Sequence, residues 1–113
     1  ENAEKYRRYN ERTKQMLTFI KRHFGEELSV RDIADSASIS ESECLRCFRK
    51  ILDTSPIAYL KTYRLQRAAE LLETTSRKVS DIAAQCGFGE MSYFAKSFRE
   101  IYRCTPSQYR SRT

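Results

Sequence analysis

The sequence carries one pattern twice. Residues 81–109, DIAAQCGFGEMSYFAKSFREIYRCTPSQY, follow the same order of residue types as residues 32–59, DIADSASISESECLRCFRKILDTSPIAY. Asp32 aligns with Asp81, whereas later in the motif Phe48 aligns with Phe98, so the second copy holds one extra residue between these points. A short chain that repeats a motif of this length is expected to fold as two copies of one small unit.

Helical periodicity runs through the whole sequence. Apolar residues recur at spacings of three and four, strand-like alternation is absent, and only three glycines and two prolines interrupt the pattern. With 113 residues, 32% charged and 40% hydrophobic, the chain suits a folded protein with a modest core. The sequence predicts an all-α fold of about seven helices. The expected ranges are 11–24, 30–37, 41–52, 56–74, 81–86, 90–102 and 106–109.

Local signals predict several helix ends. Ser29 and Ser40 are expected N-caps of the second and third helices, and Ser80 of the fifth. Gly25 is expected to end the first helix with a left-handed cap. The second and third helices are joined by so short a turn, residues 38–40, that they must cross steeply, which predicts a helix-turn-helix.

The repeat also predicts the domain organisation. Residues 1–10 are expected to be a linker from an upstream region, because they are polar and basic and lack a core face. Residues 11–55 are expected to form the first helix-turn-helix subdomain. A connecting helix over residues 56–74 and a second subdomain over residues 75–113 complete the prediction.

The four cysteines, Cys44, Cys47, Cys86 and Cys104, are interpreted as small buried apolar groups. Cys44 and Cys47 share one face of the third helix, because they are three residues apart. A structural zinc site needs a second tight ligand pair, which the other two cysteines and the lone His23 do not supply. No cofactor is therefore expected, and a thiol or zinc switch at Cys44 and Cys47 is the alternative.

Charge and composition narrow the class of protein. The formal charge of +6 and the isoelectric point of about 9.3 favour a polyanionic partner, because basic proteins gain affinity by releasing the counterions around phosphates. The sequence shows no membrane-spanning run and no secretory signal, so a cytoplasmic location is expected. An enzyme is disfavoured, because there is no phosphate-binding glycine loop and no nucleophile beside an evident base.

Over residues 17–109 the sequence resembles the C-terminal DNA-binding domain of AraC/XylS-type bacterial transcription regulators. The matching motifs are Leu28-Ser29-Val30-x-x-Ile33-Ala34, Phe48-Arg49-Lys50, Pro56-x-x-Tyr59-Leu60-x-x-x-Arg64-Leu65, Ile82-Ala83-x-x-Cys86-Gly87-Phe88, Tyr93-Phe94-x-x-x-Phe98-Arg99 and Thr105-Pro106-x-x-Tyr109. The resemblance implies seven helices, with two helix-turn-helix subdomains joined by a long helix. It implies that both recognition helices enter successive major-groove segments of promoter DNA.

The resemblance further implies sequence-specific binding of double-stranded promoter DNA for transcription regulation, with activation the commoner mode. RNA polymerase and an upstream sensory or dimerisation domain are the other expected partners. The family often has glycine after each recognition helix, where this sequence has Asp53 and Arg103. Because arginine tolerates the left-handed conformation poorly, we expect the second of these helices to end in another kind of turn.

On the first recognition helix, Cys44, Cys47, Phe48 and Ile51 are expected to face inward. By resemblance the base contacts fall at Ser42, Leu45 and Arg46. Arg46 is the strongest of these, because a guanidinium can bridge O6 and N7 of guanine. Glu43 is added, because a carboxylate can accept a hydrogen bond from N4 of cytosine.

On the second recognition helix, Phe94, Phe98 and Ile101 are expected to face inward. By resemblance its base contacts are Met91, Ser92, Ala95 and Lys96. Most of these side chains are short or apolar, so we expect weaker direct readout here, with Lys96 contributing most. The candidates for phosphate contact are Arg49, Lys50 and Arg99. The mixed Glu, Leu, Met and Ala faces leave one alternative, a helical protein-interaction module that docks on the transcription machinery without reading bases.

Overall fold

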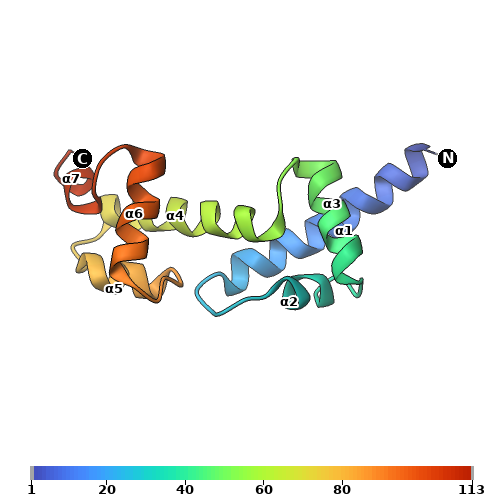
Figure 1. Cartoon of the computed structure of the whole chain (residues 1–113), viewed down its shortest axis with the longest axis horizontal. Coiled ribbons are helices and arrows are strands. Elements are labelled where there is room, and N and C mark those ends of the chain that lie inside the picture. Colours follow the sequence, from blue (N-terminus) through green and yellow to red (C-terminus); the bar gives the residue numbers. More distant parts are fainter. Residues whose placement is uncertain (1, 113) are drawn as a thin grey trace. The chain divides into compact units, whose positions relative to one another are not determined.

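The computed structural model describes residues 2–112, and every regular element in that range is a helix. The helices are α1 (Asn2–His23), α2 (Val30–Asp35), α3 (Glu41–Leu52), α4 (Pro56–Thr74), α5 (Val79–Gln85), α6 (Met91–Tyr102) and α7 (Pro106–Ser111) (Figure 1). The predictions of an all-α fold and of about seven helices are confirmed. The chain divides within α4 into two compact units, Glu1–Lys61 and Thr62–Thr113.

In the first unit, α2 and α3 both pack against α1 (Figure 1). The core between them contains Met16 and Ile20 from α1, Ile33 from α2 and Phe48 from α3, all of which are fully buried. Each such side chain stabilises the fold by about 1.5–3 kcal/mol relative to leaving it in water. The position of α3 is therefore set by apolar packing on the two helices that precede it.

Helix α1 begins at Asn2, well before the predicted start at residue 11. The sequence reading missed its buried face, which runs through Tyr9, Thr13, Met16 and Ile20 at helical spacing. Thr13 satisfies its buried hydroxyl by donating to the Tyr9 carbonyl oxygen at 2.7 Å. The expectation that the first ten residues lack a core face was wrong at Tyr9. That they link the domain to an upstream region stays a prediction.

Three of the helix starts match the caps that the sequence predicts. The Ser29 hydroxyl accepts from the Asp32 amide at 3.1 Å, and the Asp32 carboxylate accepts from the Ser29 amide at 2.9 Å. The Ser40 hydroxyl accepts from the Glu43 amide at 3.1 Å. Pro56 opens α4 as predicted. Such caps satisfy amides that would otherwise lack a partner at the start of a helix.

Two other helix ends differ from the prediction. Gly25 is not left-handed, and α1 ends at His23, whose carbonyl oxygen accepts from the Glu26 amide at 2.9 Å. Ser80 is not an N-cap, because α5 begins one residue before it and Lys78 takes the cap position without a side-chain hydrogen bond. A glycine or a serine alone therefore does not predict the end of a helix, because the conformation of the neighbouring residues also determines where the helix ends.

The core of the second unit is largely aromatic. Phe94 and Phe98 on α6 are fully buried, and the Phe98 ring packs on Tyr102 and on Tyr109 of α7, with ring centroids 4.5 and 5.4 Å apart. Ile101 was predicted to point inward and is instead 47% exposed. The packed stripe continues from Phe98 to the half-buried Tyr102, and the rings of Tyr102 and Tyr109 occupy the space beside Phe98.

The repeat is visible in the backbone of both turns. Ser38 and Gly87 stand at matching positions and both have positive φ, 57° and 89°. The residue after each donates its amide to a helix carbonyl, Ile39 to Ala34 at 3.2 Å and Phe88 to Ala83 at 2.9 Å. The extra residue of the second copy therefore lies after this turn.

The recognition helices also end alike. Asp53 and Arg103 are both left-handed C-caps, with φ of 52° and 63°. The Asp53 amide donates to the Arg49 carbonyl oxygen at 3.1 Å, and the Arg103 amide donates to the Arg99 carbonyl oxygen at 2.9 Å. The expectation of a different turn at Arg103 was wrong, because a single residue bears the modest cost of this conformation when the surrounding fold requires it.

Replacing Gly87 by alanine is expected to destabilise the protein by about 1–2 kcal/mol, because a Cβ disfavours the positive φ of this turn. The matched control is Gly89→Ala, since a Cβ at Gly89 meets no atom within 4 Å and its φ is not positive. Urea unfolding followed by circular dichroism measures both variants. Equal losses in the two variants would contradict the assigned role of Gly87.

Candidate nucleic-acid interface

Helix α3 offers one outward face in the first unit. Its inward face buries Cys44, Cys47 and Phe48, as predicted. The opposite side leaves the side chains of Ser42, Leu45 and Arg46 exposed, with Leu45 47% accessible. Three side chains predicted to contact bases thus lie on one exposed face.

A basic hollow adjoins this face. Its volume is about 390 Å³, and it lies over the second half of α3 and the loop that leads into α4. The lining residues are Leu45, Arg46, Arg49, Lys50, Thr54 and Ser55. Arg49 is 63% exposed and pairs with the still more exposed Asp53 at 3.3 Å, an ion pair that solvent screens strongly. Three cations around one hollow complement an anionic group.

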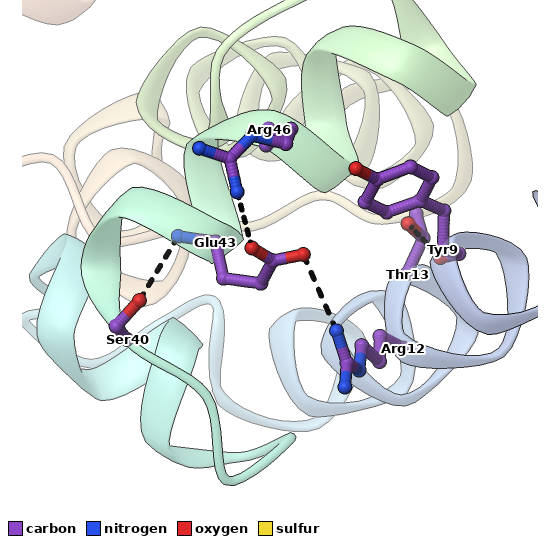
Figure 2. A network of polar contacts seen from close by, with 6 residues as sticks. All are labelled: Tyr9, Arg12, Thr13, Ser40, Glu43 and Arg46. Atoms are coloured by element: carbon purple, nitrogen blue, oxygen red, sulfur yellow. Dashed lines mark hydrogen bonds and ion pairs between the residues drawn. The ribbon is translucent and has the colours of Figure 1, made fainter. Parts of the chain in front are cut away.

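Glu43 is placed differently from the other predicted base contacts. Its side chain is only 23% exposed, and both carboxylate oxygens are engaged (Figure 2). Oε2 accepts from Nη1 of Arg12 on α1 at 3.3 Å, and Oε1 accepts from Nη1 of Arg46. The structure therefore brings Glu43 and Arg46 together. It gives the carboxylate two arginine partners within the protein.

Helix α6 presents the corresponding face in the second unit. Its inward side buries Phe94, Ser97 and Phe98. The predicted contacts Met91, Ser92 and Lys96 are exposed, Ala95 is half-buried, and the phosphate candidate Arg99 is exposed. Ile101 is also exposed, but its spacing places it on the side of Phe94 and Ser97, near the end of α6, and not on this face.

Tyr93 is a further exposed residue that sequence reasoning left out of the site. It lies in the first turn of α6, is 49% exposed, and has its ring 6.1 Å from the Phe88 ring. Tyr93 is part of the family motif, but its side chain has no charge that would suggest DNA contact. Periodicity alone does not show whether a residue at the edge of the buried stripe is exposed or packed in the core. Its exposure is visible only in the structure.

The four cysteines belong to the interior and not to these faces. All four are free thiols and buried. Burial raises the pKa of the Cys44 thiol to about 11 and that of the Cys86 thiol to about 11, and it also raises the pKa of Cys47. Thiols with raised pKa stay protonated at neutral pH, whereas the thiolate is the reactive and metal-binding form. Within residues 2–112 no group of three or more His, Cys, Asp or Glu residues is placed to hold a metal ion.

Comparison with known proteins gives one consistent result. A family model described as a helix-turn-helix domain matches residues 33–112. An uncharacterized HTH-type transcriptional regulator of Bacillus subtilis, YdeC, is 36% identical over 99 residues, which cover 88% of this chain and 34% of that protein. The crystal structure of an AraC-type DNA-binding domain protein from Chromobacterium violaceum matches with a TM-score of 0.86 at 29% identity, over 90% of this chain and 91% of that chain. This chain belongs to the AraC-type helix-turn-helix family.

A second solved structure is the DNA-binding domain of AdpA, a global transcriptional factor, in complex with a target DNA. It matches this AraC-type domain with a TM-score of 0.81 at 29% identity, over 85% of this chain and 86% of that chain. The family resemblance read from the sequence is confirmed. The prediction that the chain is not an enzyme is also confirmed, because the matched family and relatives are transcription regulators.

The AraC-type domain spans about a third of the length of the curated relatives it matches. None of the helices in residues 2–112 combines the length and apolar content needed to cross a membrane.

The burial of the thiols predicts their reactivity. In the native protein at pH 8, a water-soluble disulfide reagent such as dithiobisnitrobenzoate is expected to modify all four cysteines much more slowly than an unfolded peptide cysteine, because burial denies access and holds Cys44, Cys47 and Cys86 in the thiol form. In urea, four thiols per chain are expected to react at once. Rapid native reaction of Cys44 and Cys47 would instead support the thiol switch.

Proposed function

We propose that this chain is the DNA-binding part of a longer transcription regulator and reads double-stranded promoter DNA with α3 and α6. One observation carries the proposal. Each unit fixes a helix by burying one stripe and exposes the opposite stripe, with Arg46 on one helix and Lys96 on the other. The formal charge of +6 adds attraction to phosphates.

In the first unit we assign base contacts to Ser42, Leu45 and Arg46. Arg46 supplies the strongest preference, because bidentate contact with guanine discriminates by about 1–3 kcal/mol. Leu45 has exposed apolar surface that suits a thymine methyl group. Glu43, also predicted as a base contact, has both carboxylate oxygens on arginines, so we do not assign it a direct contact.

In the second unit we assign base contacts to Met91, Ser92, Ala95 and Lys96. Lys96 is the only cation among them and is exposed. Met91 is 43% exposed and offers apolar contact instead of hydrogen bonds. We therefore propose weaker direct readout by α6 than by α3.

Phosphate contact is assigned to Arg49, Lys50 and Arg99. All three are exposed, and the first two line the basic hollow beside α3. Contacts of this kind fix the register of a protein on the duplex and carry no sequence information themselves.

The wider role follows from the family resemblance. We propose activation of transcription in the bacterial cytoplasm, contact with RNA polymerase, and an upstream sensory or dimerisation domain in the full-length protein. We keep the proposed subdomains over residues 11–55 and 75–113 and the connecting helix over 56–74, and we propose that residues 1–10, although they include the start of α1, lead in from the upstream region. The protein-interaction alternative is not favoured, because the matched structures are DNA-binding domains.

Selection of bound duplexes from a random-sequence pool tests the proposal. The wild type is expected to enrich two boxes about one helical turn apart, one for each recognition helix. Arg46→Ala is expected to lose a guanine preference in one box and leave the other unchanged, because the two helices read separate base pairs. An equal loss in both boxes would contradict the assignment.

Arg49→Ala is the matched control on the same helix. It is expected to weaken binding to all duplexes alike, to keep the sequence preference, and to reduce the salt dependence by about one counterion. No enrichment by the wild type at moderate salt would overturn sequence-specific reading altogether.

A further inference from the structure

The Glu43 carboxylate joins two helices at the edge of the proposed reading face. Glu43 lies in the first turn of α3, and its two oxygens accept from different arginines, Arg12 of α1 and Arg46 one turn along α3 (Figure 2). Each oxygen has its own partner, so the carboxylate cannot turn without losing one contact. Both Glu43 and Arg12 are partly shielded from solvent, with 23% and 34% of their side chains exposed.

Other ion pairs of α3 differ in this respect. Arg31 and Glu41 lie 3.5 Å apart with 72% and 50% of their side chains exposed, and Arg49 and Asp53 are similarly open. Exposed pairs contribute little and are screened by salt, whereas partial burial and a shared network hold charges in place more firmly. Arg12–Glu43–Arg46 is therefore the best-shielded charge network on this helix.

The anchor for Arg12 is the buried part of α1. Tyr9 and Thr13, on either side of Arg12 in the sequence, are both buried, and the Thr13 hydroxyl donates to the Tyr9 carbonyl oxygen (Figure 2). Arg12 thus projects from a rigid turn of α1 toward α3. The carboxylate of Glu43 is held by a helix that precedes the recognition helix.

The position of the Glu43 carboxylate affects the orientation of the Arg46 guanidinium, which donates to it. A guanidinium has five N–H donors, and Arg46 directs only Nη1 at Glu43. Its Nε and Nη2 remain for O6 and N7 of a guanine, and the side chain is 52% exposed. A guanidinium already held in one orientation loses less side-chain freedom on binding than a free one does.

We propose that Glu43 is a positioning residue: clamped by Arg12, it orients Arg46 and thereby sets the strength of the guanine preference without touching a base. The proposal rests on the proposed base reading by Arg46. Glu43 also has an opposite effect on overall affinity, because its negative charge repels nearby phosphates. Removing the charge is therefore expected to strengthen binding to any duplex while it weakens discrimination.

Glu43→Gln tests this, because it keeps the size of the side chain and removes the charge. Binding is measured to the selected duplex and to one in which the guanine read by Arg46 is replaced. The expected result is higher affinity for both duplexes, with the larger gain for the duplex that lacks the guanine, so that their ratio falls about five-fold or more. The Ser40 hydroxyl, which caps α3, is untouched, and circular dichroism checks that each variant folds.

Glu41→Gln is the matched control, since it removes the same charge from the same helical turn but its partner is Arg31. It is expected to raise affinity for both duplexes and to leave their ratio unchanged. Arg12→Met leaves the Glu43–Arg46 contact in place and removes the clamp, so an intermediate fall in the ratio is expected.

Three outcomes are decisive. A ratio that Glu43→Gln leaves intact, or that Glu41→Gln lowers equally, overturns the positioning role. Loss of preference at a base pair other than the one affected by Arg46→Ala means that Glu43 contacts a base itself, which also overturns it. Absence of any guanine preference that depends on Arg46 removes the proposed base reading instead, so the two failures are distinguishable.

Discussion

Each recognition helix is fixed by the three side chains that it buries at the same positions of the repeat. These are Cys44, Cys47 and Phe48 in α3, and Phe94, Ser97 and Phe98 in α6. Because a helix is a rigid cylinder, burying one stripe determines which residues face outward, and hence which can meet another molecule. The exposed faces are consequences of apolar packing beneath them.

The two units achieve this packing with different types of side chain. In α6 two of the three buried side chains are aromatic, and the ring of Tyr109 from α7 packs on Phe98. In α3 two of the three buried side chains are small cysteines, and α1, which packs against α3, contributes the fully buried Met16 and Ile20 to the same core. The first unit therefore depends on α1, a helix that lies outside the repeated motif, so comparison of the two copies does not predict this dependence.

Much of the fold was predictable because its determinants are local. The repeat located both turns, and Ser29, Ser40 and Pro56 marked helix starts through contacts within a few residues. The errors share a cause outside the local sequence. The early start of α1 depends on the burial of Tyr9, and the exposure of Ile101 depends on rings that occupy the place beside Phe98.

The candidate site divides in the same way. Periodicity and family resemblance together indicated the exposed residues of α3 and α6, since a face follows from spacing. The engagement of Glu43 was not predictable, because its partner Arg12 belongs to a helix whose register the sequence reading had only partly seen. The sequence analysis treated Glu43 as available for contact with a base, whereas in the structure its carboxylate already accepts from Arg12 of α1.

The network around Glu43 bears on how the DNA preference of such a domain can evolve. A mutation on the recognition helix alters both the surface that meets DNA and the core that holds it, so its effects are hard to separate. Arg12 lies on another helix and contributes no assigned base contact, yet it is bonded to the residue that holds Arg46. Under the proposed role of Glu43, a substitution at this one position of α1 changes how strictly the domain chooses its sites and leaves the recognition helix itself unaltered.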